Sequence, residues 1–134
     1  MIVADTNLLA YLLLPGERTE DAERAYQRDA DWVAPLLWRS EFRNVLALYM
    51  RQGLLTLPRA LTLMRRAEEM MNGREYAVSS EQILDLITRS HCSAYDCEFV
   101  ALAQDLGVPL VTADQRILRE FPDTAQSLDA FGRT

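Results

Sequence analysis

Met1-Ile2-Val3-Ala4-Asp5-Thr6-Asn7 opens the chain and decides its fold, because a short apolar run ends there at an acid and two small polar residues. A helical pattern begins directly afterwards, at Leu8. This order predicts a buried strand that delivers Asp5 to the carboxyl edge of a sheet, where ligands bind in open α/β folds. A buried carboxylate at such an edge needs a partner, a proton or a metal ion. The question is which other groups reach the same edge.

Length and composition favour one domain. The chain has 134 residues and 49% hydrophobic content, enough for a single core. Its longest apolar run, residues 8–14, is too short to cross a bilayer, and the N-terminus lacks the basic flank of a signal peptide. Cys92 and Cys97 form neither a CxxC motif nor a disulfide framework. We expect one cytoplasmic domain over residues 1–134, with reduced thiols and no membrane association.

The charge pattern leaves nucleic-acid chemistry open. A net charge of −6 argues against non-specific coating of nucleic acid. It does not argue against a nucleic-acid enzyme, because an acidic metal site itself lowers the net charge. The chain has 14 arginines and no lysine. Arginine suits bidentate phosphate contacts. Biased codon usage explains the absence of lysine at least as well.

Strand and helix patterns alternate along the chain. We expect strands at 1–4, 31–34, 74–78, 108–112 and 125–128, helices at 8–14, 17–28, 36–52, 58–71, 79–89, 95–106 and 115–119, and a tail at 129–134. Such alternation favours an α/β fold whose central sheet is mainly parallel and flanked by helices.

Glu41 is an acid on the apolar stripe of a helix. It lies one turn from both Leu37 and Val45, so it shares their face. A carboxylate on a core-facing stripe is unusual. An ion pair with Arg39 or Arg43 explains it as well as a functional role does, unless a second acid converges on the same place.

Two further acids stand where this fold would bring them near Asp5. Asp114 follows the apolar run 108–112, so it repeats the geometry of the opening stretch. Asp96 opens the helix 95–106, which leads into that second strand. Each has a structural explanation, since acids at helix starts cap the helix or complement its dipole. The joint pattern is harder to explain structurally, because parallel strands bring both strand-end acids to one edge.

Four converging carboxylates favour a divalent cation. They cannot all ionise unaided, because like charges raise one another's pKa. All-oxygen ligands select Mg²⁺ or Mn²⁺ over zinc or copper. The cation would activate a water molecule for attack on a phosphodiester, and Asn7 and Thr112 would orient waters or carboxylates beside it.

These residues also carry a family resemblance. Four segments resemble the four signatures of the PIN-domain nucleases: Asp5-Thr6-Asn7, residues 41–46, Tyr95-Asp96 with 101–103, and residues 111–114. Their order, spacing and the chain length are most similar to the VapC-type toxins of prokaryotic toxin–antitoxin pairs. The resemblance implies a PIN-like fold and a Mg²⁺- or Mn²⁺-dependent endoribonuclease that cuts single-stranded or loop RNA. It also implies a small homodimer that a cognate antitoxin holds inactive.

Motif matching assigns roles within the site. It gives catalytic or metal-binding roles to Asp5, Glu41, Asp96, Asp114 and Thr112, with Asn7 in support. Some family members carry a further acid just beyond the last motif, whereas Gln115 and Arg116 stand there in this chain. Helical spacing predicts that Glu98 points to another side of its helix than the neighbouring site acid. By sequence proximity, we expect phosphate contacts from Arg39, Arg43 and Arg116.

Other classes fit the sequence less well. A haloacid-dehalogenase-like phosphatase or a response-regulator receiver would need a catalytic lysine, and the chain has none. A catalytically silent PIN-like protein-binding module remains the alternative, although all four acids are present. Tyr11, Leu12, Leu13 and the methionine-bearing helix 58–71 are candidates for the antitoxin surface.

Overall fold

The computed structural model describes residues 1–133 as helices arranged around a five-stranded sheet. The strands are β1 (Ile2–Ala4), β2 (Trp32–Pro35), β3 (Glu75–Tyr76), β4 (Leu110–Thr112) and β5 (Ala125–Ser127). They lie in the order β3-β2-β1-β4-β5, and every neighbouring pair is parallel. The predicted α/β class is confirmed, and the sheet is parallel throughout.

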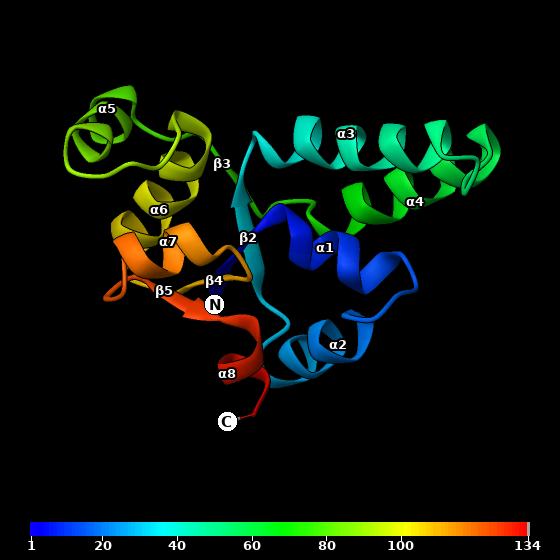
Figure 1. The fold of residues 1–134 in the computed structure, drawn as a ribbon, viewed down its shortest axis with the longest axis horizontal. Coiled ribbons are helices and arrows are strands. Elements are labelled where there is room, and N and C mark those ends of the chain that lie inside the picture. The colour runs from blue at the N-terminus through cyan, green and yellow to red at the C-terminus, as the bar shows by residue number, and fades with distance from the viewer. Residues whose placement is uncertain (134) are drawn as a thin grey trace.

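Helices connect the strands and cover the sheet (Figure 1). They are α1 (Thr6–Leu13), α2 (Thr19–Arg28), α3 (Trp38–Arg51), α4 (Leu57–Met70), α5 (Ser80–Thr88), α6 (Ala94–Leu106), α7 (Gln115–Glu120) and α8 (Leu128–Arg133). Helix α6 packs across β1, β2 and β4 and carries α5 on its outer side. Helices α3 and α4 form a hairpin on the other side of the strands in this view. Within residues 1–133, no helix is both long enough and apolar enough to cross a bilayer.

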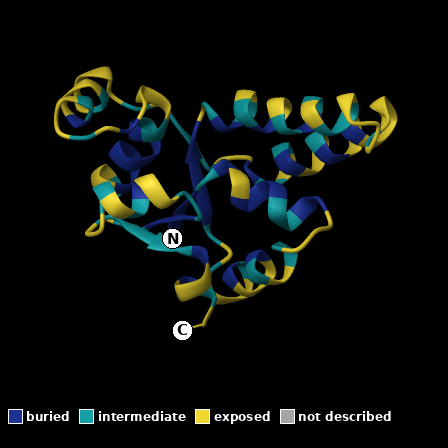
Figure 2. Cartoon of the chain, viewed as in Figure 1, coloured by how far each residue is buried: buried dark blue, intermediate teal, exposed yellow. Residues whose placement is uncertain are grey.

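The central strands are short apolar runs because both of their faces are covered. All residues of β1, β2 and β4 are buried, and Figure 2 shows the strands as the dark interior of the molecule. Burial on both faces is the usual state of a parallel sheet. This explains why the opening apolar run predicts a strand although it lacks alternation of apolar and polar residues.

Several predicted helix ends are confirmed by their caps. The side chains of Ser79 and Ser93 accept hydrogen bonds from backbone N–H groups in the first turns of α5 and α6. Gly107 ends α6 with a left-handed backbone, φ 67°, which glycine adopts without steric cost. Helix α6 is therefore fixed at both ends, and its first turn holds one of the predicted site acids.

The predicted tail at 129–134 is wrong for the part of it that the structure describes. Residues Leu128–Arg133 form α8, which packs against α2, while Thr134 lies outside the described residues. Leu128 and Phe131 are buried, and the guanidinium of Arg28 lies 4.1 Å from the centre of the Phe131 ring. A six-residue segment is too short to show helical periodicity, so its burial depends on contacts that only the tertiary fold creates.

The apolar faces of α3 and α4 differ from the expected ones. The buried residues of α3 are Trp38, Phe42 and Leu46, whereas Leu48 is 52% exposed. In α4, Leu61 is 44% exposed, whereas Ala60, Leu63 and Ala67 are buried. Each helix of the hairpin buries one stripe of side chains and leaves part of its apolar residues in solvent.

Candidate active site

Two strand ends bring Asp5 and Asp114 to the same edge of the sheet. β1 and β4 are neighbours, and Asp5 N donates a hydrogen bond to the Val111 carbonyl at 3.1 Å. The buried Thr112 hydroxyl links the two acids: it donates to Asp5 Oδ2 at 2.6 Å and accepts from the Asp114 backbone N–H at 3.0 Å. Asp114 also caps α7, since its Oδ1 accepts from the N–H groups of Arg116 and Ile117. Its capping role therefore coexists with a place at the site.

Glu41 comes to this edge from α3, one turn after the end of β2. Its Oε1 accepts a hydrogen bond from the Thr6 hydroxyl at 2.8 Å. The alternative ion pair with Arg39 is wrong, because that guanidinium binds Glu75 at 2.6 Å and Glu68 at 3.1 Å. Glu41 does share a face with Leu37 and Val45, but that face is half-buried and does not face the core as predicted, and a hydroxyl holds the carboxylate instead of an arginine.

Asp96 comes from the first turn of α6. The side chain of Ser93, and not that of Asp96, caps this helix, because Ser93 Oγ accepts the Asp96 N–H at 3.0 Å. The Asp96 carboxylate is thus not used in capping, although its position still complements the helix dipole. We call Asp5, Glu41, Asp96 and Asp114 the acidic site.

Neighbouring carboxylates act on the pKa of two of the four acids, Asp5 and Glu41. Burial raises the pKa of Asp5, and the charges of Asp114 and Asp96 raise it further. Burial also raises the pKa of Glu41, with additional contributions from Asp5, Asp96 and Glu98. The Thr112 and Thr6 hydroxyls act in the opposite direction by stabilising the ionised forms. Among residues 1–133, no ion pair joins a member of the acidic site to a basic side chain.

A cavity of about 440 Å³ opens beside these acids. This lies within the ~300–1,000 Å³ range of small-ligand pockets. Its lining residues come from the starts of α1 and α6 and from one face of α3: Asp5, Thr6, Asn7, Leu37, Ser40, Glu41, Asn44, Val45 and Tyr95. The lining does not include Asp96 or Asp114. We call this space the site cavity.

The donor set fits a hard cation that keeps part of its hydration. All the candidate donors are carboxylate and hydroxyl oxygens, and the excess negative charge has no basic partner in the described part of the chain. Within residues 1–133, however, no three His, Cys, Asp or Glu side chains already form a metal-binding group. Mg²⁺ tolerates this arrangement, because it retains several waters and binds proteins through one or two carboxylates. The residues therefore suit Mg²⁺ or Mn²⁺ better than a fully protein-ligated ion.

Some site residues escape prediction from the sequence. Thr6, Ser40, Asn44 and Tyr95 line the site cavity beside the predicted acids. Residues 40, 41, 44 and 45 lie on one side of α3, the side that lines the cavity. Once Glu41 is placed at the site, helical periodicity predicts that Ser40 and Asn44 lie beside it. Glu98 was expected on another side of its helix, yet its charge acts on Glu41 and burial raises its own pKa.

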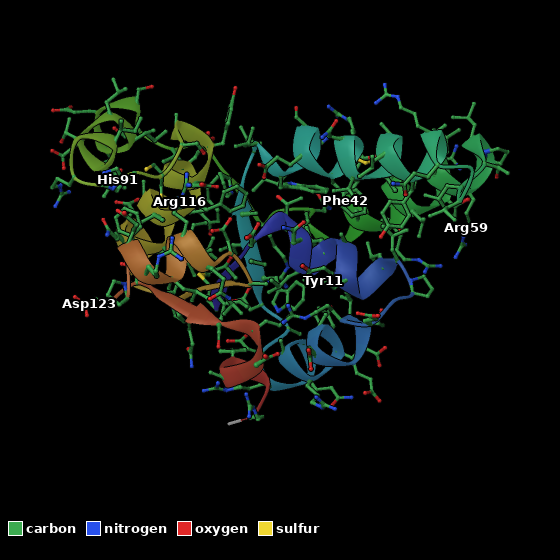
Figure 3. The ribbon with its side chains drawn as sticks, in the orientation of Figure 1. Tyr11, Phe42, Arg59, His91, Arg116 and Asp123 are labelled. Atoms are coloured by element: carbon green, nitrogen blue, oxygen red, sulfur yellow. The ribbon has the colours of Figure 1, made fainter. Side chains whose placement is uncertain are left out.

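The three arginines differ in their surroundings. Arg39 is held by its two glutamates. Arg43 is exposed and forms no ion pair with another residue of the 1–133 range. Arg116 donates to the His91 carbonyl at 3.4 Å, and Figure 3 shows these two residues close together on one side of the molecule. The His91 ring is exposed and bonds Glu120 at 3.0 Å.

Comparison with known proteins agrees with this geometry. The chain belongs to the PIN domain family, whose sequence model matches residues 2–123. It is 30% identical over 124 residues to Ribonuclease VapC3 of Pyrobaculum aerophilum, covering 90% of this chain and 95% of that protein. The resemblance to VapC-type proteins that the motifs indicated is thereby confirmed.

Solved structures share the fold. The crystal structure of PAE2754 from Pyrobaculum aerophilum has a TM-score of 0.77 at 17% identity and covers 99% of this chain and 96% of that one. A toxin–antitoxin complex from Klebsiella pneumoniae contains a chain with a TM-score of 0.68 at 18% identity, covering 96% of this chain and 98% of that one. The predicted PIN-like fold is confirmed.

Proposed function

We propose that this protein is a Mg²⁺- or Mn²⁺-dependent endoribonuclease and the toxin of a toxin–antitoxin pair. The observation that carries the proposal is the acidic site: carboxylates from four separate elements come to one edge of the sheet, neighbouring carboxylate charges raise the pKa of Asp5 and of Glu41, and within residues 1–133 no basic side chain forms an ion pair with any of the four. Membership of the PIN domain family and the relative named Ribonuclease VapC3 support RNA as the substrate. An RNA substrate also favours the cytoplasmic location expected from the sequence.

Each residue of the site has a distinct task in this proposal. Asp5, Glu41, Asp96 and Asp114 would hold the cation, which activates water and offsets the negative charge of the phosphoryl group. The Thr112 hydroxyl fixes one oxygen of Asp5, and the N–H of Asn7 lies 3.4 Å from the other. We assign Thr112 to the catalytic set and Asn7 to its support because both orient Asp5.

Phosphate contacts are proposed for the three arginines, which their surroundings now rank. Arg43 is the first candidate, because it is exposed and its guanidinium has no acidic partner within residues 1–133. Arg116 is the second, since its donors are in part used by the His91 carbonyl. Arg39 is the weakest candidate, because two glutamates already bind it.

A cognate antitoxin and a second copy of the chain are the proposed partners. The Klebsiella pneumoniae neighbour is named a toxin–antitoxin complex, which supports the first of these. Of the candidates for the antitoxin-binding surface, Leu13 is buried and is therefore not proposed, while Tyr11 and Leu12 are half-buried. The exposed leucines of the α3–α4 hairpin extend the candidate surface: Leu48, Leu54, Leu57 and Leu61.

The test is cleavage of a mixed RNA pool by the purified protein without antitoxin. The reaction is run with Mg²⁺, with Mn²⁺ and with EDTA, beside the variant Asp5→Asn. We expect cleavage with at least one metal, and its loss in EDTA and in Asp5→Asn. A matched control is Asp105→Asn, since Asp105 is exposed on α6 and away from the cavity lining.

Folded protein that cuts no RNA under any of these conditions would favour the alternative, a catalytically silent PIN-like binding module. Thermal unfolding with and without Mn²⁺ then decides whether the acidic site binds a cation at all. A metal-dependent increase in Tm in the wild type, absent in Asp5→Asn, would retain the metal site without the nuclease.

A further inference from the structure

Tyr95 is an exposed aromatic side chain in the wall of the site cavity. It is 63% exposed, whereas every other Tyr, Phe and Trp within residues 1–133 is buried or half-buried. A single exposed apolar residue is common and needs no explanation by itself. Its position is the second observation: it lines the cavity beside Asp5 and Glu41 and immediately precedes Asp96 in the chain.

The site cavity has an apolar and an acidic part. Its lining residues include the apolar or aromatic Leu37, Val45 and Tyr95 and the acidic Asp5 and Glu41. A nucleotide has the same division, because its base has apolar faces and its phosphate is charged and binds cations. The cavity volume of about 440 Å³ admits a ligand of this size class.

The backbone under the ring is held firmly. Tyr95 lies in the first turn of α6, where Ser93 accepts the Asp96 N–H at 3.0 Å and the Cys97 N–H donates to the Ser93 carbonyl at 2.9 Å. Tyrosine has few rotatable bonds, so it provides a large flat surface at a small cost in conformational entropy. The ring is therefore attached at a fixed point beside the acidic site.

We propose that Tyr95 is a stacking platform for one unpaired nucleobase of the RNA substrate, adjacent to the bond that is cut. The inference rests on the proposed ribonuclease function and specifies how its substrate is held. Aromatic side chains bind splayed-out bases in this way, and stacking tolerates any base because each has a π-face. The platform selects single-stranded segments, since duplex RNA keeps its base faces within its own stack.

The experiment combines an abasic substrate with variants of Tyr95. A cut site is first mapped with wild-type protein, and short single-stranded RNAs are made with an abasic ribose on either side of that site. Wild type, Tyr95→Ala and Tyr95→Phe are compared with the control Leu84→Ala, which removes an equally exposed apolar side chain (61%) on α5. The readouts are kcat and KM on intact and abasic RNA.

We expect wild type to lose about tenfold in kcat/KM on one abasic RNA, mainly through KM. Tyr95→Ala should lose the same factor on intact RNA and nothing further on that abasic RNA, because the two changes remove the same contact. Tyr95→Phe and Leu84→Ala should match wild type. Equal sensitivity of wild type and Tyr95→Ala to the missing base would overturn the proposal. A Tyr95→Ala effect limited to dimerisation or antitoxin binding would overturn it too.

A second measurement separates this inference from the nuclease proposal. Fluorescence anisotropy with a labelled single-stranded RNA and a fully abasic oligomer measures binding in the Asp5→Asn background, where cleavage plays no part. Suppose that wild type cuts no RNA, but that Asp5→Asn binds the intact RNA more tightly than the abasic oligomer and loses this preference when Tyr95 is replaced by alanine. The stacking proposal then stands and the nuclease proposal fails. Equal binding of both oligomers would refute the platform.

Discussion

Replacing Thr112 by valine tests whether one buried hydroxyl holds the acidic site in place. Thr112 is 0% exposed, and its hydroxyl donates to Asp5 Oδ2 at 2.6 Å and accepts from the Asp114 N–H at 3.0 Å. Valine has nearly the same shape but can form neither bond. The substitution therefore leaves the packing intact and removes two hydrogen bonds from a buried position.

The expected loss of stability follows from these two bonds. A hydrogen bond to a charged group contributes about 1.5–3 kcal/mol and one to a backbone N–H about 1 kcal/mol. The additional buried methyl group of valine stabilises the folded state by about 0.8 kcal/mol and offsets part of this loss. The net decrease in the free energy of unfolding should be about 2–3 kcal/mol at pH 7, which corresponds to a Tm decrease of about 6–10 °C for a domain of this size.

The loss should also depend on pH. The folded-state pKa of Asp5 lies above the ordinary 3.8, so ionisation of Asp5 reduces stability as the pH rises through that folded pKa. The Thr112 bond lowers the same pKa because it stabilises the ionised carboxylate. The difference between wild type and Thr112→Val should therefore be largest at neutral pH and shrink as the pH falls through the raised pKa of Asp5.

Urea unfolding in EDTA, at pH 7 and in steps down to pH 4, measures both effects. The matched control is Thr62→Val, where an exposed hydroxyl bonds only the Pro58 carbonyl of its own helix, and a change within about 0.5 kcal/mol is expected. Equal stability of Thr112→Val and wild type would refute the reasoning. A difference that is the same at every pH would show that Asp5 does not take part in it.

Three other substitutions test different parts of the structure by urea unfolding. Asp5→Asn should stabilise the metal-free protein at pH 7, because it removes a charge that burial and two neighbouring carboxylates disfavour, while exposed Asp105→Asn stays neutral; a destabilised Asp5→Asn would contradict this. Phe131→Ala should lower the free energy of unfolding by about 3–4 kcal/mol, because the ring is buried, whereas its control Leu61→Ala, at an exposed position, should lower it by under about 1 kcal/mol. Similar losses in the two variants would mean that α8 is not part of the core. Glu75→Gln should lose about 1 kcal/mol at pH 7. Its arginine partner lowers the pKa of Glu75 below the usual 4.5, so this loss should shrink as the pH falls through the lowered pKa, and a loss that stays constant throughout an acid titration would argue against it.

Most of the fold could be predicted because a doubly covered parallel sheet leaves clear marks in a sequence. The apolar runs 1–4 and 108–112 contain the central strands, and the helix starts at Ser79 and Ser93 follow from capping chemistry. The C-terminal helix could not be predicted. Its apolar residues Leu128 and Phe131 are too few to define a period, and the surface that buries them belongs to α2, far away in the sequence.

For the site, the sequence predicts which acids come to the sheet edge of Asp5 better than how they are held. Strand ends and one helical stripe were enough to predict that Asp5, Glu41 and Asp114 converge. The partner of Glu41 was not predictable, because Thr6 and Arg39 are both near it in the topology and only side-chain geometry decides between them. Which exposed side chains line a cavity depends on the relative rotation of α3 and α6, which sequence periodicity does not report.

Two hydroxyls explain how the acidic site can be ordered and still ready for a ligand. Thr112 binds only one oxygen of Asp5, and Thr6 binds only Oε1 of Glu41. In the described part of the chain, Oε2 of Glu41 receives no hydrogen bond, and no buried side-chain oxygen is left unsatisfied, so that atom faces solvent. Each threonine thus fixes a carboxylate by one oxygen; the other oxygen of Asp5 accepts from the Asn7 N–H at 3.4 Å, whereas Oε2 of Glu41 stays available. The free protein bears the repulsion of these acids, and any cation that relieves it binds the folded state alone and therefore stabilises it.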